Sequence, residues 1–381
     1  MANTDRDYPI APRIGVGLLR WARSQLFRTP AYPAQSFAGQ TIIVTGSNVG
    51  LGLEAARHFY RLGCARLILG VRSRAKGEAA KEDILASVAA RTDGGRAVEV
   101  WDLDMNSTAS VLSFADRVHR DIGRLDVLVL GAGASLRRWS TVQDVDGVWE
   151  TMVQVNVVNT FLLALELLPK LREASKDVGQ APRLVVISSE AHRLTSFSEA
   201  EEADIYGTMS QEGKFNVNDR YSATKLMEIL LVRELVARLK TVDGSPVVIN
   251  LINPGTCHSA LNRDINPPFV ALIAIKAIQF IFERTTEVGS RTYVYGAAAG
   301  PEAHGELMSD GELQQVESWI YTDTGKKVQA KLFDQTMTRP REVTPETLKY
   351  AKLQGLNLTN ATKQPDLRES PGLQSIDDWA L

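Results

Sequence analysis

The chain has little cysteine, no long apolar run and no excess of charge of either sign. Its two cysteines, Cys64 and Cys257, lack the spacing of a metal or redox motif, which indicates a reducing compartment and argues against a disulfide framework. The N-terminal residues MANTDRDYPI are too acidic and polar for a secretory leader, and no run reaches the roughly eighteen apolar residues of a membrane span. We therefore expect a cytoplasmic location, with peripheral contact to an intracellular membrane as an open alternative.

The bulk composition is that of an ordinary soluble globular protein. Of the 381 residues, 44% are hydrophobic and 23% are charged. The formal net charge of −2 provides no basic excess that would indicate nucleic acid as a partner. This length accommodates one large domain or two medium ones, and we find no internal repeat.

An N-terminal extension, residues 1–35, contains a basic amphipathic helix. Apolar side chains gather on one side of its helical wheel and arginines lie mostly opposite: Ile14, Leu18, Leu19, Trp21, Ala22 and Leu26, against Arg13, Arg20 and Arg23. Such a helix lies on a membrane surface, packs on the domain, or pairs with a second chain in a homodimer. The sequence leaves these alternatives open.

Strands and helices alternate from residue 40 onward. We expect strands at 41–44, 66–71, 97–101, 127–130, 184–188 and 247–252, and helices at 51–62, 75–89, 110–122, 148–171 and 221–239. Near-continuous apolar strands separated by helices predict an α/β protein whose parallel sheet is covered on both faces. Right-handed crossovers make this a single Rossmann-type doubly wound domain, residues 36–345, followed by a loose tail, residues 346–381.

A glycine-rich loop joins the first strand to the first helix, the context that a phosphate-binding loop requires. Gly46 permits the tight turn, Gly50 lets backbone amides approach a pyrophosphate, and Gly52 lets helix and strand pack closely. The N-terminus of the helix adds a favourable dipole for the anion. We predict that the loop binds a dinucleotide through Gly46, Ser47, Asn48, Gly50, Leu51 and Gly52.

The end of the second strand indicates which dinucleotide binds. An acidic residue there would bind a ribose 2′-hydroxyl, but the segment contains Arg72 and other cations instead. Arg72 can form charge-assisted bonds to a 2′-phosphate, and Ser47 can add a hydroxyl, so we predict NADP(H). After the third strand, Asp104 and Met105 are expected beside the adenine, with Asp104 bonding its amino group.

Tyr221 and Lys225 are four residues apart on a predicted helix and therefore share one face. A phenol normally loses its proton near pH 10. A neighbouring cation favours the phenolate, so we expect Lys225 to bring the pKa of Tyr221 toward the working range. The pair is typical of a unit that exchanges a proton with a carbonyl oxygen, although the spacing alone also arises on ordinary helices.

Together these motifs make residues 38–340 resemble the short-chain dehydrogenase/reductase family, in particular its retinol-dehydrogenase-like branch, and they are similar to fungal reductases of secondary metabolism. The resemblance implies that Ser189, Tyr221, Lys225 and Asn156 are catalytic. It implies that Ser189 polarises a carbonyl, Tyr221 protonates the alkoxide, and Lys225 also holds the nicotinamide ribose. Asn156 would hold a water linked to Lys225. Further cofactor contacts carried by the resemblance are Ala132, Gly133, Asn156, Tyr221, Lys225, Pro254 and Ser259.

One position departs from the family pattern. The family has an Asn-Ala-Gly segment after the fourth strand, and this chain has Gly131 in place of the asparagine. The loss of that side chain leaves a polar group to find another partner. Neither His192 nor His258 has partners at metal-ligand spacing, so we predict no metal site.

Two segments are expected to set the substrate. These are the polar insertion at 195–220 and the apolar stretch at 267–282, which covers a hydrophobic ligand, a second subunit or a lipid surface, or packs in the core. We expect a bulky hydrophobic ketone or aldehyde, such as a polyketide-type intermediate. A retinoid or steroid alcohol at a membrane surface and a non-catalytic NADP-binding regulator remain as alternatives.

Overall fold

The computed structural model describes Ile10 and residues 14–88, 97–145, 147–175, 181–239, 247–258 and 282–338. One eight-stranded sheet runs through this part of the chain, in the order β10-β9-β8-β7-β4-β1-β2-β3. Its strands are β1 Thr41–Thr45, β2 Arg66–Val71, β3 Val98–Asp102, β4 Val127–Leu130, β7 Arg183–Ile187, β8 Val248–Asn253, β9 Leu307–Ser309 and β10 Glu312–Gln314. Neighbouring strands are parallel except β9 and β10, which pair antiparallel.

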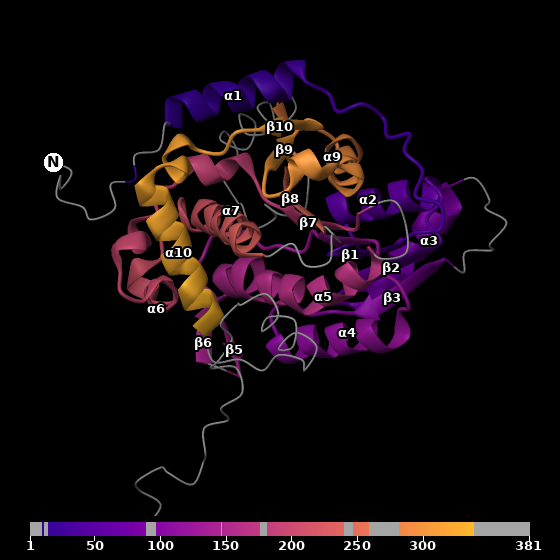
Figure 1. Cartoon of the computed structure of the whole chain (residues 1–381), viewed down its shortest axis with the longest axis horizontal. Helices are drawn as coiled ribbons and strands as arrows, with labels where there is room; N and C mark the ends of the chain where they lie inside the picture. Colours follow the sequence, from indigo (N-terminus) through magenta and orange to yellow (C-terminus); the bar gives the residue numbers. More distant parts are fainter. Residues whose placement is uncertain are drawn as a thin grey trace, which may run out of the picture.

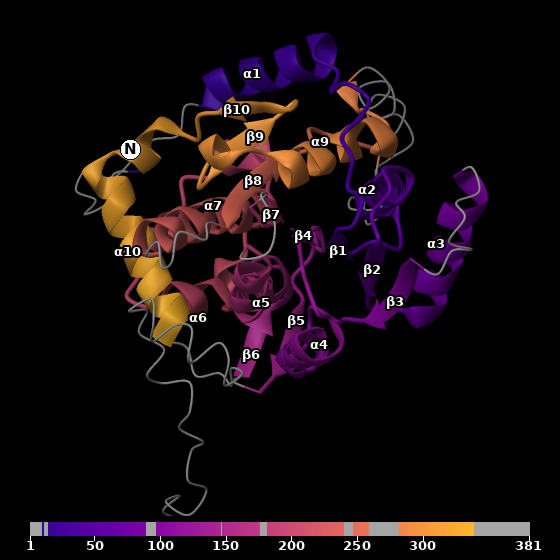
Figure 2. The ribbon, with the colours of Figure 1, turned by 45° about the vertical axis from the view of Figure 1, so that its right-hand side comes forward.

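Helices cover both faces of this sheet (Figure 1, Figure 2). One face packs against α4 Thr108–Asp121, α5 Thr160–Ala174 and α7 Arg220–Arg238, and the other against α2 Gly50–Arg61, α3 Arg74–Ser87 and α9 Thr286–Ala298. Alternate strand residues feed the two cores, since Ile43 of β1 joins the first while Ile42 and Val44 join the second. The predicted Rossmann-type fold is confirmed, because the central strands are parallel and a layer of helices packs on each face of the sheet.

The expected helix over 148–171 is wrong at its start. Residues 147–150 form strand β6 Gly147–Glu150, which pairs antiparallel with β5 Thr141–Asp144. A π-helix, Val153–Asn159, then leads into α5. The apolar residues of this segment do not reveal that Val148 and Trp149 pair with a neighbouring strand instead of facing a helix partner. Asn156 lies within the π-helix. Such segments are rare in proteins, and many of those that occur lie at functional sites.

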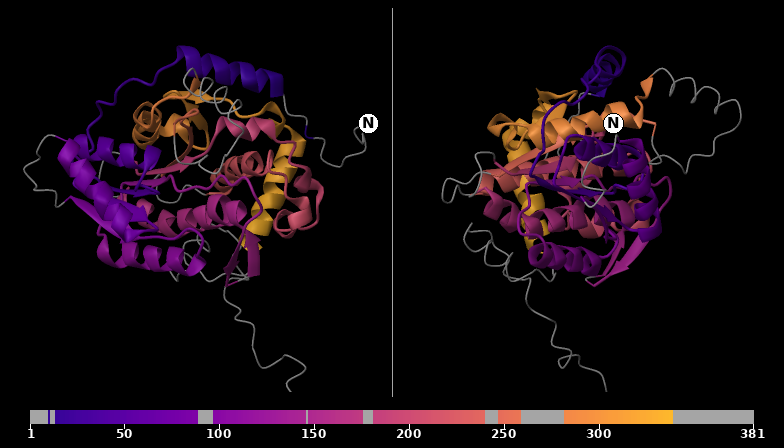
Figure 3. Two further views of the ribbon diagram at one scale, coloured as in Figure 1. Left: turned by 180° about the vertical axis from the view of Figure 1, so that it is seen from behind. Right: turned by 90° about the vertical axis from the view of Figure 1, so that its right-hand side faces the viewer.

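The C-terminal part adds elements that the sequence did not predict. Helix α10 Asp323–Thr338 packs against α7 (Figure 1, Figure 3) and places Phe333 against Phe161 of α5, with ring centroids 5.8 Å apart. The 195–220 insertion contains the short helix α6 Ile205–Met209 and hydrogen bonds to α10, where Lys331 Nζ donates to Ala200 O at 2.8 Å. The insertion is therefore anchored to the body of the domain.

Helix α1, Ile14–Phe27, lies beside β10 at one end of the sheet (Figure 1, Figure 2). Trp21 Nε1 donates to Thr256 Oγ1 at 2.8 Å, and its ring stacks on Phe282 at 5.2 Å. Through these contacts Trp21 faces the domain. Leu19 and Phe27 are 72% and 79% exposed and face outward. The single apolar side predicted from the helical wheel is thus wrong in detail, because inward contacts are made largely by polar side chains. None of the described helices is long and apolar enough to cross a membrane.

Candidate functional site

The predicted site residues meet at one edge of the sheet, where β1, β4, β7 and β8 end side by side. Each strand leads directly into a predicted segment: the glycine loop after β1, Gly131–Gly133 after β4, Ser189 after β7 and Pro254 after β8. Helix α7 brings Tyr221 and Lys225 to the same edge. Ligands of open α/β sheets bind at this edge, outside the carboxyl ends of the strands.

The glycine loop has the close backbone geometry that the sequence predicts. Gly46 has a φ of +69°, and a Cβ on Gly52 would lie 2.5 Å from the carbonyl oxygen of Gly46. Helix α2 follows an extended Val49 whose side chain makes no capping bond, so the first amides of the helix have no side-chain cap. These amides and the short-range packing fit the phosphates of a dinucleotide.

Two predicted cofactor contacts have other partners. Ser47 is fully buried and its hydroxyl donates to Val44 O at 2.9 Å, so this hydroxyl does not face a 2′-phosphate as we expected. Asp104 Oδ1 accepts from both the backbone amide and the side chain of Asn106, at 3.0 and 2.8 Å, and so shapes its own loop. Both residues position the backbone of the site.

The cations after β2 differ from one another. Arg74 pairs with Glu78 at 3.7 Å and Asp102 at 3.4 Å. Arg72 is exposed and makes no hydrogen bond or ion pair within the part of the chain that the structure describes. Its guanidinium is therefore available for an anionic ligand, as the sequence predicts.

The two remaining predicted contacts differ in what the structure describes. Met105 is buried, and Ser259 lies outside the described residues.

The Gly131 position is explained by its neighbours. The amides of Gly131 and Ala132 donate to Thr45 Oγ1 at 3.0 and 3.1 Å, which ties the end of β4 to the end of β1. A Cβ on Gly131 would lie 3.1 Å from Thr45 O and 3.2 Å from the ring of Tyr293. Thr45 and Tyr293 thus occupy the space around this glycine, and the threonine serves as the polar partner.

Asn156 connects three elements through its side chain. Its Oδ1 accepts from Ala134 N at 2.7 Å, and its Nδ2 donates to Ala134 O at 2.9 Å and to Thr224 Oγ1 at 3.1 Å. Both amide protons are used, so the side chain fixes the loop after β4 against α7. The sequence did not single out Thr224, which has no motif of its own.

Ser189, Tyr221 and Lys225 lie together at the end of β7. Lys225 Nζ donates to Ile187 O at 2.9 Å and to Glu228 Oε1 at 2.7 Å, and its Nζ lies 5.7 Å from the centre of the Tyr221 ring. Ser189 lies near enough to Tyr221 to lower the pKa of its phenol. Burial raises the pKa of Tyr221, and this effect together with Glu228 outweighs the lowering by Lys225 and Ser189. The predicted downward shift is therefore wrong: Tyr221 is held protonated, as a proton donor requires.

A parallel sheet, an uncapped helix after a tight glycine loop, and polar groups gathered at the carboxyl edge define a dinucleotide-binding Rossmann-type protein. A family model described as short chain dehydrogenase matches residues 40–200. The chain is 42% identical to the short chain dehydrogenase atnD of Emericella nidulans, over 81% of this chain and 93% of that protein. It is 37% identical to the short chain dehydrogenase/reductase dmxR8 of a Cryptosporiopsis species, over 84% of this chain and 97% of that protein.

The protein belongs to the short-chain dehydrogenase/reductase family, and it is similar to fungal secondary-metabolism members of that family. It is an oxidoreductase of the class that acts on alcohol and carbonyl groups. A crystal structure of an uncharacterized protein from Mycobacterium paratuberculosis covers 79% of this chain and 95% of its own, with a TM-score of 0.56 and 27% identity. The Pseudomonas aeruginosa RhlG structure has the same fold, with a TM-score of 0.53, 24% identity and coverage of 73% of this chain and 97% of its own.

Proposed function

We propose that the protein interconverts a ketone or aldehyde and an alcohol on a bulky hydrophobic substrate, with NADP(H) as the cofactor. The observation that carries this proposal is the placement of Ser189, Tyr221 and Lys225 beside the edge where the glycine loop begins. When bound, the nicotinamide supplies or accepts the hydride. The protein residues supply position and the proton.

In the direction of reduction, the hydroxyls of Ser189 and Tyr221 bind the carbonyl oxygen. Negative charge that develops on this oxygen is stabilised by both donors, and Tyr221 transfers its proton to it, which completes the alcohol. The raised pKa of Tyr221 keeps that proton in place until the oxygen becomes basic. The ammonium of Lys225 then stabilises the phenolate that forms.

Arg72 favours a cofactor with a 2′-phosphate. It follows β2 directly, is exposed, and is not paired with a described acidic residue, whereas a discriminating carboxylate is absent from 70–74. Structures of this fold include complexes with NADP and with NADH, so the fold itself does not select between them. The choice rests on Arg72.

Two aromatic side chains support a hydrophobic substrate. Trp139, beyond the loop after β4, and Phe215, shortly before α7, are half-buried and meet edge to face with ring centroids 5.7 Å apart. Both loops leave the sheet near the predicted catalytic edge. Aromatic pairs of this kind supply a flat apolar contact for a ring system. The fungal relatives agree with a secondary-metabolite substrate, and a retinoid or steroid is the second candidate.

The purified protein should be assayed with NADPH and NADH on aromatic ketones, quinones and retinal. We expect NADPH consumption equal to the amount of alcohol formed, with NADH much less effective. Binding of NADPH without turnover on the whole panel would identify a non-catalytic NADP-binding regulator instead. A product that has lost water or rearranged after reduction would change the net reaction but keep the cofactor.

We also propose that the outer face of α1, defined here as Leu19, Arg20, Arg23 and Phe27, makes peripheral contact with an anionic membrane. All four side chains are exposed, and they combine apolar and basic groups on one helix. The other apolar candidate, 267–282, lies outside the described residues except for Phe282. A homodimer stays a prediction, which light scattering on the purified protein would test.

A further inference from the structure

Glu228 is a buried acidic residue at the predicted catalytic edge to which no role has been given. It follows Lys225 by one helical turn on α7 and is only 5% exposed. Its Oε1 accepts from Lys225 Nζ at 2.7 Å. Its Oε2 is fully buried and has no hydrogen-bond partner in the described part of the chain. In the sequence Glu228 is the sole charged residue within Leu226–Val232, which is the signal that could have identified it.

Two of the three N–H donors of Lys225 have partners in the protein, which leaves one donor for a ligand. An ammonium group has three N–H donors. One is used by Ile187 O at 2.9 Å and a second by Glu228, so a single donor remains for other groups. A Cβ on the exposed Gly133 would lie 3.9 Å from Lys225 Nζ, which places this ammonium close to the open edge of the sheet. Glu228 and Ile187 therefore determine where the last donor points.

The buried ammonium of Lys225 also needs a negative partner, which Glu228 supplies. Burial is the largest effect and lowers the pKa of Lys225, but the charge and hydrogen bond of Glu228 together with Tyr221 outweigh it, so that the pKa is raised and the lysine stays protonated. Burial in turn raises the pKa of Glu228 to about 7, in spite of the lowering by Lys225. Glu228 also raises the pKa values of Tyr221 and of the buried Tyr293 of α9. Among the described residues, Lys225, Tyr221 and Tyr293 are the titratable groups coupled to Glu228, whereas Ser188, Asn156 and Thr160 beside it are neutral.

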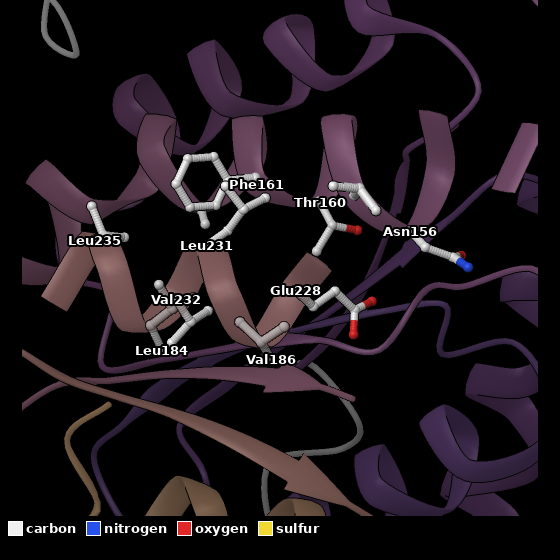
Figure 4. A pocket seen from close by; sticks show the side chains of 11 residues that line it. Asn156, Thr160, Phe161, Leu184, Val186, Glu228, Leu231, Val232 and Leu235 are labelled. Atoms are coloured by element: carbon white, nitrogen blue, oxygen red, sulfur yellow. The ribbon is translucent and has the colours of Figure 1, made fainter. Parts of the chain in front are cut away.

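A small cavity of about 10 Å³ borders Glu228 between α5, α7 and β7. Its carboxylate lies at the end of the cavity near Asn156 and Thr160, while Leu231, Val232 and Leu235 line the other end (Figure 4). This volume is near the lower limit for one water molecule. The surroundings of Glu228 thus offer little solvent, and Lys225 is its main partner.

We propose that Glu228 is a positioning residue that keeps Lys225 as an ammonium ion and aims its remaining donor at the open edge beside Tyr221. This inference rests on the proposed function, since it concerns the same proton-transfer site. Removing the lysine's counter-charge leaves a buried cation that loses its proton more readily. The stabilisation of the Tyr221 phenolate then depends on a cation that is no longer maintained.

Glu228→Gln keeps the shape and an acceptor oxygen but removes the charge. Without this charge, Lys225 and Tyr221 both bind protons less tightly, so the alkaline limb of kcat/KM for reduction should move to lower pH by roughly one unit. Turnover at pH values below this limb should change much less, because Tyr221 remains in place as the general acid. Glu234→Gln is the matched control, because Glu234 lies on the same helix but pairs with Arg238 away from the site. This control should leave the pH profile unchanged.

A second matched pair separates charge from packing. Glu228→Asp and Glu228→Asn have the same shortened shape, and only the aspartate retains the charge. We expect the asparagine variant to show the alkaline limb at lower pH than the aspartate variant, whether or not Glu228→Gln folds. A merely structural role would lower thermal stability and turnover alike in both members of a pair without moving the limb.

Identical alkaline limbs within each pair, in folded variants that turn over, would overturn the proposal. Wild-type protein with bound NADPH but no turnover would instead refute the proposed function, so the two failures are distinguishable. Thermal unfolding and NADPH titration of every variant establish that each protein is folded and binds its cofactor.

Discussion

The glycine loop and the Tyr221–Glu228 turn of α7 reach the same edge of the sheet, but different forces hold them. The loop is held by backbone proximity, with a Cβ at Gly52 excluded by the carbonyl of Gly46 at 2.5 Å. The α7 turn is held by buried charge, in which Lys225 contacts Ile187 and Glu228. Local sequence spacing suffices to build the first arrangement, whereas the second requires groups brought together from β7 and α7. Substitutions should therefore damage cofactor binding in one region and proton transfer in the other.

The largest expected effect separates chemistry from binding. Tyr221→Phe removes the proton donor and should lower kcat by about a hundredfold or more, since a positioned general acid contributes on that scale. The Kd for NADPH should change little, because the phenyl ring retains the packing. Steady-state kinetics and a fluorescence titration of NADPH measure the two quantities. Near-normal turnover in this variant would remove Tyr221 from the mechanism.

Gly52→Ala should affect the other region. The added methyl forces the loop and α2 apart, and overpacking of this kind costs roughly 1–3 kcal/mol. We expect the Kd for NADPH to rise by about tenfold to a hundredfold, with some loss of thermal stability. Gly123→Ala is the control, since nothing lies within 4 Å of a Cβ there. Unchanged NADPH affinity would show that the loop does not bind the dinucleotide.

Arg72→Ala should sharpen the comparison within the cofactor region. Loss of a charge-assisted bond costs roughly 1.5–3 kcal/mol, so kcat/KM with NADPH should fall about tenfold or more. Activity with NADH should be almost unaffected, because that cofactor has no 2′-phosphate. The exposed Arg120, which pairs with Asp121, provides the control substitution Arg120→Ala. An equal loss with both cofactors would contradict the role in 2′-phosphate recognition.

The smallest effect concerns the outer face of α1, whose exposed Leu19 and Phe27 belong to neither region. Replacing Leu19 and Phe27 by serine should reduce cosedimentation with anionic vesicles several-fold, since apolar insertion and basic charge act together in such helices. Turnover on a soluble substrate should be unchanged. Neutral phosphatidylcholine vesicles serve as the control surface. Absence of wild-type binding to anionic vesicles would refute the membrane contact.

The sequence predicted the sheet well, because its strands are short apolar runs between helices and turn residues. The prediction was wrong for 148–150, where residues that fit a helix pair instead with β5. Helix α10 was not predicted, because polar residues on its outer face alternate with the apolar residues that it buries. Tyr221 and Lys225 could be selected because they are four residues apart, and Ser189 because it stands where the family pattern has its serine. Ser47 was assigned an outward hydroxyl because spacing does not tell which way a side chain points.

The sequence by itself determined the alternation of the parallel strands with helices up to β8, the tight glycine loop and the identity of the groups available for proton transfer. These follow from local periodicity and from backbone conformations that only glycine adopts readily. Only the tertiary structure decided the protonation of Tyr221, the partners of Asn156 and the pairing of Lys225 with Glu228. Burial and distance set these properties, and both arise when β7, the π-helix and α7 pack against one another.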